Sequence, residues 1–286
     1  MKHKKRRTNL KEINIDKLLN LKKHKNKSTY KKSISKKTPK KERKSNRVIK
    51  QAKAEQKKVS SGIPKFDALI EGGFEKNSAN VVVGGSGSGK TILATQFLIE
   101  GMKQGEKCLY VTFEEKKEQF YKNMLEFGWN LEEYEKKKLF TFLEYTPVKV
   151  KAMLDEGGGA IETAIIRQGI TRIVIDSITS FALLFEKELE KREAALMLFN
   201  MISEWHCTSL LTLEEDPLNT KETPSKTIEF ESDSIILIYF TQQKGERKRY
   251  IEILKMRGVK HSKNIYEFEI GSHGVNLLSK RSDRIE

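Results

Sequence analysis

Residues 81–91 constrain the fold more than any other segment, because an apolar run enters a glycine-rich turn and then a helical pattern. Three valines lead into a turn from Gly84 to Gly89, and Lys90-Thr91 open the apolar periodicity of residues 92–98. The spacing fits G-x-x-x-x-G-K-[ST], the phosphate-binding P-loop. A strand before the loop and a helix after it are the context that the motif requires, so a flexible Gly/Ser linker is the weaker interpretation. The segment therefore predicts a nucleotide-binding protein.

Each part of this loop has an expected role. Glycines let successive backbone N–H groups converge on one point, and the helix N-terminus adds the positive end of its dipole. Lys90 is expected to reach the β- and γ-phosphates, and the Thr91 hydroxyl to ligate Mg²⁺. The predicted nucleotide-binding residues are Gly84, Gly85, Ser86, Gly87, Ser88, Gly89, Lys90, Thr91 and Ile92.

The net charge of +16 is distributed unevenly along the chain. Residues 1–58 hold 24 Lys and Arg against four acidic residues, whereas the remainder holds 31 basic and 35 acidic residues. The tail thus carries +20 and the rest of the chain −4, which does not support a basic patch over the nucleotide site. We expect a basic, largely disordered tail over residues 1–58 and one folded domain over residues 59–286.

Two interpretations of the tail have equal weight. It is either a solubilising extension or a segment that attaches without sequence specificity to nucleic acid or another polyanion. Tyr30 is its one aromatic residue, so base stacking adds little to recognition. A short amphipathic stretch within it could fold on a partner, with Ile13, Ile15, Leu18, Leu19 and Leu21 as its apolar positions.

The cellular location is predicted from cysteines and from the lengths of apolar runs. Cys108 and Cys207 lie in apolar stretches without a C-x-x-C pair, as buried free thiols in a reducing cytoplasm do. No apolar run approaches the length of a membrane span, and the basic N-terminus leads into no signal-peptide apolar region. We expect a cytoplasmic protein that is not an integral membrane protein.

Strand patterns alternate with helical patterns after the P-loop, which predicts an α/β fold with a mostly parallel central sheet flanked by helices. The expected strands cover residues 107–113, 140–143, 171–176 and 208–213. A helix over residues 186–205 is expected to turn Leu189, Ala195, Leu196, Phe199 and Ile202 inward, and one after residue 159 to carry Ile161, Ala164, Ile165 and Ile166. Three later strands, over residues 234–240, 249–255 and 264–270, are expected to add antiparallel edges.

Acidic residues follow two of these strands at the point where each ends. Glu114 and Glu115 come after one strand, and Asp176 closes another. Ligands of open α/β sheets bind at the carboxyl ends of the strands. We therefore expect these three carboxylates beside the P-loop.

Five separated blocks occur in an order that resembles the KaiC-like branch of RecA-fold ATPases. The resemblance covers about Val59–Ser279. Within that branch, the chain is similar to the single-domain archaeal KaiC-related proteins. The blocks are Ser61-Gly62-Ile63-Pro64 with Asp67, the P-loop, Thr112-Phe113-Glu114-Glu115, Val174-Ile175-Asp176-Ser177 and Leu254-Lys255-Met256-Arg257-Gly258.

The resemblance implies a role for each matching residue. Asp176 matches the Walker B aspartate that holds Mg²⁺, directly or through water. Glu114 and Glu115 match the paired carboxylates of which one polarises the attacking water; Glu115 is favoured, although the sequence does not separate them. Lys255 and Arg257 match a K-x-R finger, whose i, i+2 spacing puts both cations on one face of a strand.

That finger implies an oligomer. In RecA-like hexamers it reaches the neighbouring subunit's ATP site, so the resemblance implies a homo-oligomer, a hexameric ring, with ATP and Mg²⁺ as its ligands. Ordinary edge-strand charges are the alternative explanation. The choice of ATP over GTP rests on the resemblance alone.

Two positions depart from the family pattern. Glu229-Phe230 stand where the clock protein's second domain has adjacent phosphorylated Ser and Thr residues, which argues against clock-type autophosphorylation. Thr212 lies where the family keeps a polar residue that senses the γ-phosphate, but its neighbour Leu213 is apolar.

Three hypotheses follow for the function. The leading one is an Mg²⁺-dependent KaiC-like ATPase that works between ring subunits and regulates a protein partner. The second is a nucleotide-sensing scaffold with little hydrolysis, and the third is a RecA/Rad55-like DNA repair ATPase. The basic tail supports the third hypothesis, and the acidic remainder of the chain opposes it.

Overall fold

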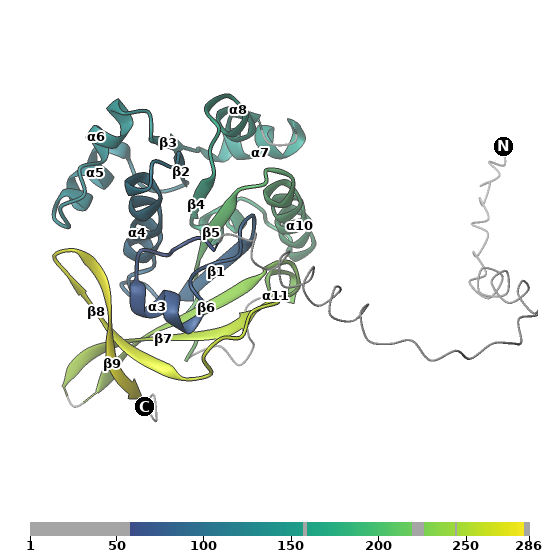
Figure 1. Cartoon of the computed structure of the whole chain (residues 1–286). Helices are drawn as coiled ribbons and strands as arrows, with labels where there is room; N and C mark the ends of the chain where they lie inside the picture. Colours follow the sequence, from purple (N-terminus) through teal and green to yellow (C-terminus); the bar gives the residue numbers. More distant parts are fainter. Residues whose placement is uncertain (1–57, 157–158, 219–225, 244, 283–286) are drawn as a thin grey trace, which may run out of the picture. The chain divides into compact units, whose positions relative to one another are not determined.

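The computed structural model describes residues 58–156, 159–218, 226–243 and 245–282, so the predicted tail lies outside the described residues except for Lys58. The strands in this part of the chain form one nine-stranded sheet in the order β3-β2-β4-β5-β1-β6-β7-β8-β9 (Figure 1). The strands are β1 Ala79–Gly84, β2 Cys108–Thr112, β3 Phe140–Glu144, β4 Arg172–Asp176, β5 Thr208–Glu214, β6 Ser234–Gln243, β7 Glu246–Met256, β8 Ile265–Gly271 and β9 Gly274–Ser282.

Six neighbouring strands, from β3 to β6, are parallel, and β7, β8 and β9 continue the sheet in antiparallel fashion. Every residue of β1 and β2 is buried. Strands buried on both faces form continuous apolar runs, and such runs occur in sheets covered by helices on both sides. The predicted α/β fold, with a mostly parallel sheet and antiparallel edge strands, is confirmed.

Two hydrophobic clusters occupy the two faces of the sheet, and side chains of β1 alternate between them. Val82 belongs to one cluster, whereas Val81 and Val83 belong to the other. The Val82 cluster lies under α3 Pro64–Leu69, α4 Lys90–Lys103, α5 Lys117–Leu125 and α6 Leu131–Lys136. The other cluster lies under α7 Pro147–Glu156, α8 Gly159–Gln168, α9 Ile178–Ala182, α10 Glu188–Glu204 and α11 Lys226–Glu231. None of the helices in the described part of the chain is long and apolar enough to cross a membrane.

The expectation for residues 234–240 was wrong in direction. Their strand, β6, lies parallel to β1 in the interior of the sheet, and the antiparallel extension begins only with β7. A buried apolar run looks the same in a parallel and an antiparallel strand, so the residues alone did not fix its direction. The β6–β7 hairpin is long, and its register places Ser234 opposite Met256.

The inward face of α10 also differs from the expectation. Leu189 and Leu196 are 66% and 40% exposed, whereas Ala194 and Leu198 are buried. Apolar residues cover more than one face of the second half of this helix, so its periodicity is compatible with two stripes. The register that packs is the one with Ala194, Leu198, Phe199 and Ile202 inside. In α8, Ile166 is likewise exposed, although the other three predicted positions are buried.

A buried cation connects several segments at the amino end of β4, the end away from the P-loop. Arg172, the first residue of β4, is fully buried, and its guanidinium donates to both carboxylate oxygens of Glu106 at 2.7 and 3.0 Å. Its third nitrogen donates to the carbonyl oxygens of Ser60 at 2.7 Å and Phe97 at 2.9 Å. The bidentate pair and the carbonyl contacts satisfy the guanidinium in the interior, and they connect β4 to α4 and to the segment before α3.

Candidate functional site

A cavity of about 370 Å³ lies at the carboxyl ends of β1, β2, β4 and β5. It brings together predicted residues from three separate segments, namely the P-loop, the acids after β2 and the aspartate that ends β4. Because these strands are parallel, their carboxyl ends meet at one edge of the sheet. The cavity is lined by Ser86, Gly87, Lys90, Thr91, Thr112, Glu114, Glu115, Asp176, Ser177 and Glu214.

The P-loop has the tight backbone that its glycines predict. Gly89 precedes α4 with φ of 104°, a left-handed conformation that side chains disfavour. A Cβ added at Gly84 would lie 2.7 Å from Ser88 Oγ and 2.8 Å from the Ile238 carbonyl oxygen. Glycine at both positions thus lets the chain turn from β1 into α4 within the space available. Ile92 lies one turn further and packs against the hydrophobic cluster under α4.

Lys90 points back along the loop that carries it. Its Nζ donates to the carbonyl oxygens of Gly84 at 2.8 Å and Gly85 at 2.9 Å. Burial lowers the pKa of this ammonium, while the charges of Glu214, Asp176 and Glu114 act in the opposite direction. An anion beside Lys90 would restore the stabilisation that the ammonium loses by leaving water, so the cradle fits a phosphate.

Asp176 accepts hydrogen bonds from three hydroxyl groups. Thr91 Oγ1 donates to Asp176 Oδ2 at 2.8 Å, and Tyr110 Oη donates to the same oxygen at 2.6 Å. Thr212 donates to Oδ1, the other carboxylate oxygen. The two predicted metal ligands, Thr91 and Asp176, are therefore in direct contact. Thr212, the candidate γ-phosphate sensor, contacts the aspartate in this structure.

The two glutamates after β2 occupy different surroundings. The Thr112 hydroxyl accepts the backbone N–H groups of Glu114 at 3.2 Å and Glu115 at 3.1 Å, which fixes the turn into α5. Asn123 of α5 donates to Glu115 Oε1 at 3.1 Å. Burial raises the pKa of both carboxyl groups, and the negative charge of Asp176 raises them further, while the Asn123 bond opposes the rise at Glu115.

Several residues at this site were not predicted from the sequence, and Arg249 is the clearest example. Arg249 lies opposite Phe240 in the β6–β7 ladder, donates to the Gly87 carbonyl oxygen at 3.1 Å and stacks 4.3 Å from the centre of the Phe240 ring. It therefore supports the P-loop from the antiparallel side of the sheet. No local pattern could have identified it, because the contact joins residues 162 positions apart. Tyr110 and Asn123 were missed for the same reason, whereas Glu214, at the carboxyl end of β5, could have been found by the rule that places the other acids at the strand ends.

Lys255 and Arg257 do not reach this cavity in their own chain. Lys255 pairs with Ile235 near the amino end of the parallel strands, away from the strand ends that carry the P-loop. Its Nζ donates to the carbonyl oxygens of Ser232, at 2.6 Å, and Glu229, and Arg257 donates to that of Phe230. Both cations thus bind carbonyl groups at the end of α11, which lack partners within the helix.

Asp233 connects Arg257 to the start of β1. The Asp233 carboxylate accepts the Ala79 N–H at 2.9 Å and lies 3.7 Å from the Arg257 guanidinium. Its backbone N–H donates to the Ala79 carbonyl oxygen at 2.7 Å. The cation at one end of the sheet and the P-loop at the other are therefore both attached to β1.

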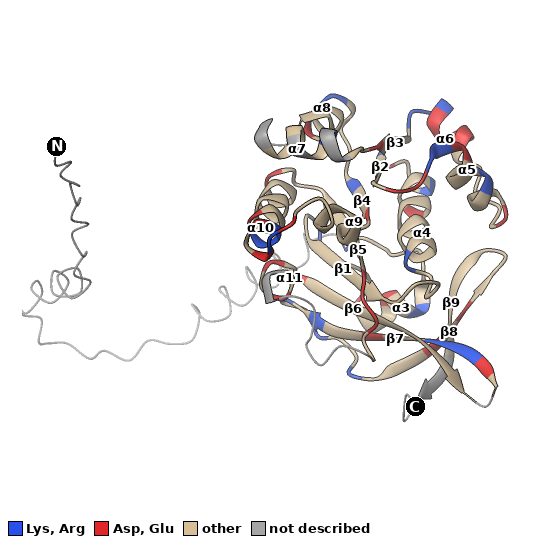
Figure 2. Ribbon diagram, turned by 180° about the vertical axis from the view of Figure 1, so that it is seen from behind, with Lys and Arg blue, Asp and Glu red and all other residues tan. Residues whose placement is uncertain are grey.

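The cavity holds an excess of negative charge. Among its lining residues, Lys90 is opposed by four carboxylates, those of Glu114, Glu115, Asp176 and Glu214. In the rest of the part of the chain that the structure describes, Lys and Arg are scattered among Asp and Glu, apart from a basic stretch at the start of β7 (Figure 2). A nucleotide adds further negative charge, so its binding here calls for cations beyond Lys90.

The residues present fit Mg²⁺ held together with a nucleotide. Within the described ranges, no three His, Cys, Asp or Glu side chains form a metal cluster of their own. Mg²⁺ usually keeps several waters and takes one or two protein ligands plus substrate phosphates. The Thr91 hydroxyl and the Asp176 carboxylate, in contact beside the phosphate cradle, supply that kind of donor set.

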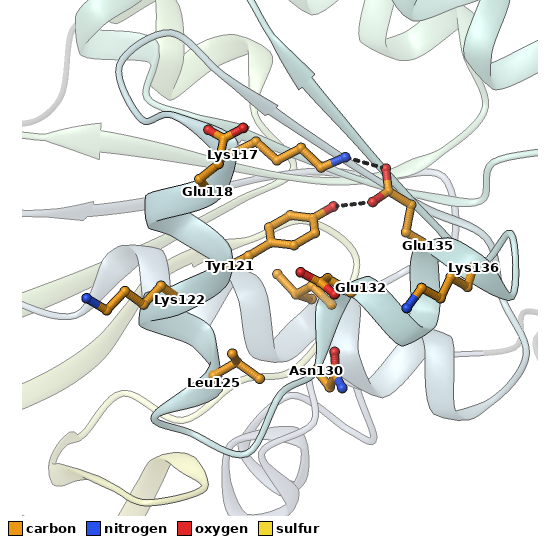
Figure 3. A pocket seen from close by; sticks show the side chains of 10 residues that line it. Lys117, Glu118, Tyr121, Lys122, Leu125, Asn130, Glu132, Glu135 and Lys136 are labelled. Carbon is orange, nitrogen blue, oxygen red and sulfur yellow. Dashed lines mark hydrogen bonds and ion pairs between the residues drawn. The ribbon is translucent and has the colours of Figure 1, made fainter.

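A second cavity, of about 450 Å³, lies between α5 and α6 (Figure 3). Lys117 forms an ion pair with Glu135 at 2.7 Å across it, and the Tyr121 hydroxyl donates to the same carboxylate at 3.2 Å. None of its lining residues also lines the first cavity. Its charged groups mainly join α5 to α6, and the phosphate cradle belongs to the first cavity.

The fold and the first cavity together define a P-loop nucleotide-binding protein of the α/β class. A family profile described as "ATPase: KaiC" matches residues 59–282. The chain belongs to this KaiC family of ATPases. It is similar to circadian clock protein KaiC3 of Synechocystis, with 32% identity over 80% of this chain and 47% of the relative.

Shorter relatives match over almost their whole length. A UPF0273 protein of Thermotoga maritima is 32% identical over 77% of this chain and 95% of the relative. The crystal structure of a KaiC-like protein from the archaeon Pyrococcus horikoshii matches with a TM-score of 0.70 and 36% identity, over 78% of this chain and 99% of that one. The chain thus spans about half of the KaiC3 relative and nearly all of the UPF0273 relative.

Proposed function

We propose that this protein is a regulatory ATPase that hydrolyses ATP to ADP and phosphate, with Mg²⁺, between subunits of a ring. The observation that carries the proposal is the 2.8 Å hydrogen bond between Thr91 and Asp176. It joins the P-loop helix to the end of β4 inside the cavity that also holds Glu115. A phosphate cradle alone accounts for nucleotide binding, whereas the added carboxylates supply the groups that hydrolysis requires.

The P-loop amides and Lys90 would bind the phosphates, and Arg249 would keep the loop in place through Gly87. Thr91 and Asp176 would hold Mg²⁺, which when bound neutralises phosphate charge and orients the phosphoryl group. Glu115 would accept the proton of the attacking water, since Asn123 fixes its position. Glu114 is the alternative base.

The ring is proposed from the position of Lys255 and Arg257. The cavity's excess of carboxylates calls for cations, and these two lie at the other end of their own sheet. A second copy of the chain can bring them to the site, where a cation supplied in trans stabilises the charge of the transferring phosphoryl group. We therefore propose a homo-oligomer, a hexamer by analogy with the family, in which hydrolysis changes how subunits meet and so acts on a partner.

A double substitution tests the assignment of hydrolysis. In Glu114→Gln with Glu115→Gln, binding of a fluorescent ATP analogue should persist, because neither carboxylate is expected to contact the phosphates. Phosphate release should fall by about 10²–10⁴-fold, the usual contribution of a positioned general base. The matched control is Glu118→Gln, because Glu118 is an exposed residue of α5 that does not line the cavity of the P-loop. Undiminished turnover in the double variant would refute the proposal, and loss of nucleotide binding would show a different role for these acids.

A further inference from the structure

Tyr110 lies in the middle of β2 and is fully buried. Its ring stacks on Phe142 of β3, with centroids 5.6 Å apart and planes 4° from parallel. It also packs against Phe120 of α5 at a centroid distance of 4.3 Å. These contacts hold the ring from two sides, so the direction of its hydroxyl group is fixed by packing.

That hydroxyl group reaches the site through a single contact. Tyr110 Oη donates to Asp176 Oδ2 at 2.6 Å, the oxygen that also accepts the Thr91 hydroxyl. The other residues of β2 are smaller, and a phenylalanine would make the same ring contacts. Packing therefore does not account for the oxygen of Tyr110. A buried phenol needs a hydrogen-bond partner, and here the partner is the carboxylate at the end of β4.

We propose that Tyr110 is a positioning residue, whose hydroxyl holds the Asp176 carboxylate in the orientation that the metal–nucleotide complex requires. The inference rests on the proposed function, because it concerns the same site. A threonine hydroxyl can donate its proton to a carboxylate and still offer a lone pair to a metal. The orientation of Asp176 therefore sets the direction in which Thr91 presents that lone pair, and Tyr110 fixes Asp176 from an element outside the P-loop.

The test is Tyr110→Phe, which removes one oxygen atom and keeps the ring. Affinity for a non-hydrolysable ATP analogue is measured by calorimetry with Mn²⁺ and again with EDTA. Outer-sphere partners of metal ligands typically contribute about 10- to 100-fold to metal affinity. Tyr110 is such an outer-sphere partner, because it contacts the proposed metal ligand Asp176. We therefore expect the gain in nucleotide affinity caused by Mn²⁺ to fall by about that factor in Tyr110→Phe. The affinity measured in EDTA should stay within about twofold of wild type.

Tyr121→Phe is the matched control. Tyr121 belongs to the same aromatic group, 5.9 Å from the Phe142 ring, but its hydroxyl donates to Glu135 of α6. Its Mn²⁺-dependent gain should equal that of wild type. Hydrolysis gives a second measurement: in Tyr110→Phe the Mg²⁺ concentration for half-maximal rate should rise by the same factor, and saturating Mg²⁺ should recover most of the rate.

Each of three other outcomes would overturn a specific claim. A wild-type gain from Mn²⁺ that Tyr110→Phe retains in full would overturn the role of Tyr110 and leave the proposed function intact. A wild-type protein whose affinity does not respond to Mn²⁺ would overturn the metal site itself. A Tyr110→Phe chain that loses its circular dichroism spectrum, while Tyr121→Phe keeps it, would make the hydroxyl a structural group and also overturn the assignment.

Discussion

Asn123 donates to Glu115 from 3.1 Å, so the helix that follows the adjacent pair of glutamates holds the second of them. Within the described residues, the first, Glu114, has no side-chain hydrogen bond and is exposed. A base held in one position is the better proton acceptor, because small displacements of a catalytic group reduce its rate steeply. This geometry supports the proposal of Glu115 as the base, which the sequence favoured without separating the pair.

The prediction is that Glu115→Gln lowers turnover more than Glu114→Gln does, and that Asn123→Ala lowers it by about tenfold at unchanged ATP affinity. Single-turnover phosphate release, with binding measured separately, checks both statements. Gln119→Ala is the control, since Gln119 donates to Asn123 Oδ1 on the exposed side and leaves the bond to Glu115 in place. An Asn123→Ala enzyme with wild-type turnover would remove the reason for preferring Glu115.

The raised pKa values of Glu114 and Glu115 predict how turnover depends on pH. Burial is the main cause of each rise above 4.5, followed at Glu114 by the charges of Asp176 and Glu214. A general base must be ionised, and kcat/KM reports the pKa values of the free enzyme, so kcat/KM for ATP should decline as pH falls, with a midpoint above 4.5. A rate that stays constant down to that pH would contradict the assignment.

The contribution of these two glutamates to the stability of the nucleotide-free protein should become more favourable as pH falls, the opposite of the change in turnover. For a carboxyl group whose pKa is higher in the folded than in the unfolded state, ionisation weakens the fold as pH rises. At neutral pH both glutamates are therefore a small destabilising factor. The double glutamine variant should melt at a higher temperature than wild type, as measured by calorimetry without nucleotide.

Mixing two inactive variants tests whether Lys255 and Arg257 act in trans. Lys90→Ala removes the phosphate cradle and Arg257→Ala removes a cation that the neighbour is proposed to use. In an equal mixture, about a quarter of the interfaces in a closed ring combine an intact cradle with an intact cation. Activity should recover toward that fraction of wild type, whereas each variant alone stays inactive. Recovery no greater than the average of the two variants would place the cations outside the reaction.

Glu106 and Arg172 predict an acid-sensitive contribution to stability. Arg172 is buried, so Glu106→Gln leaves its charge without a carboxylate, at a cost of about 2–3 kcal/mol once the partial exposure of Glu106 is allowed for. Urea unfolding at neutral pH measures this. Glu133→Gln, at an exposed i, i+4 pair, should cost less than about 0.5 kcal/mol as the control.

The sign of its pH dependence follows from the pKa of Glu106. Burial alone would raise that pKa, but the hydrogen bonds and charge of Arg172 outweigh burial and hold it below 4.5. The contribution is thus present above the unfolded-state pKa and lost as pH falls through the folded-state value. The stability difference between wild type and Glu106→Gln should shrink below about pH 4.5. A difference that is independent of pH would contradict the ion pair.

The parts of the site that lie within one segment could be predicted from the sequence. The P-loop is specified by its own spacing, and the acids after β2 and β4 are placed by the rule that parallel strands end at one edge. Tyr110 and Arg249 could not be found this way. Each acts through one long-range contact, with Asp176 and with Gly87, and packing between strands decides that contact.

The fold was predictable to a similar degree. Alternation of strand and helix patterns specifies a parallel sheet, but the direction of β6 and the buried face of α10 depend on which neighbours are present. Leu189 and Leu196 are apolar at helical spacing and are nevertheless exposed, because Ala194 and Leu198 fill the space against the sheet. Strand β9 was not predicted, since its sequence mixes apolar and polar residues in no long run.

Strand β1 has a mechanical consequence. It spans six residues, about 20 Å, with the phosphate loop at its carboxyl end and Asp233, the anchor of Arg257, at its amino end. This strand therefore sets the distance between the loop that would bind the subunit's own nucleotide and the residues proposed to contact the neighbouring subunit. In the proposed ring, the nucleotide site of one subunit and its contact with the next subunit would therefore be joined by a single fully buried strand.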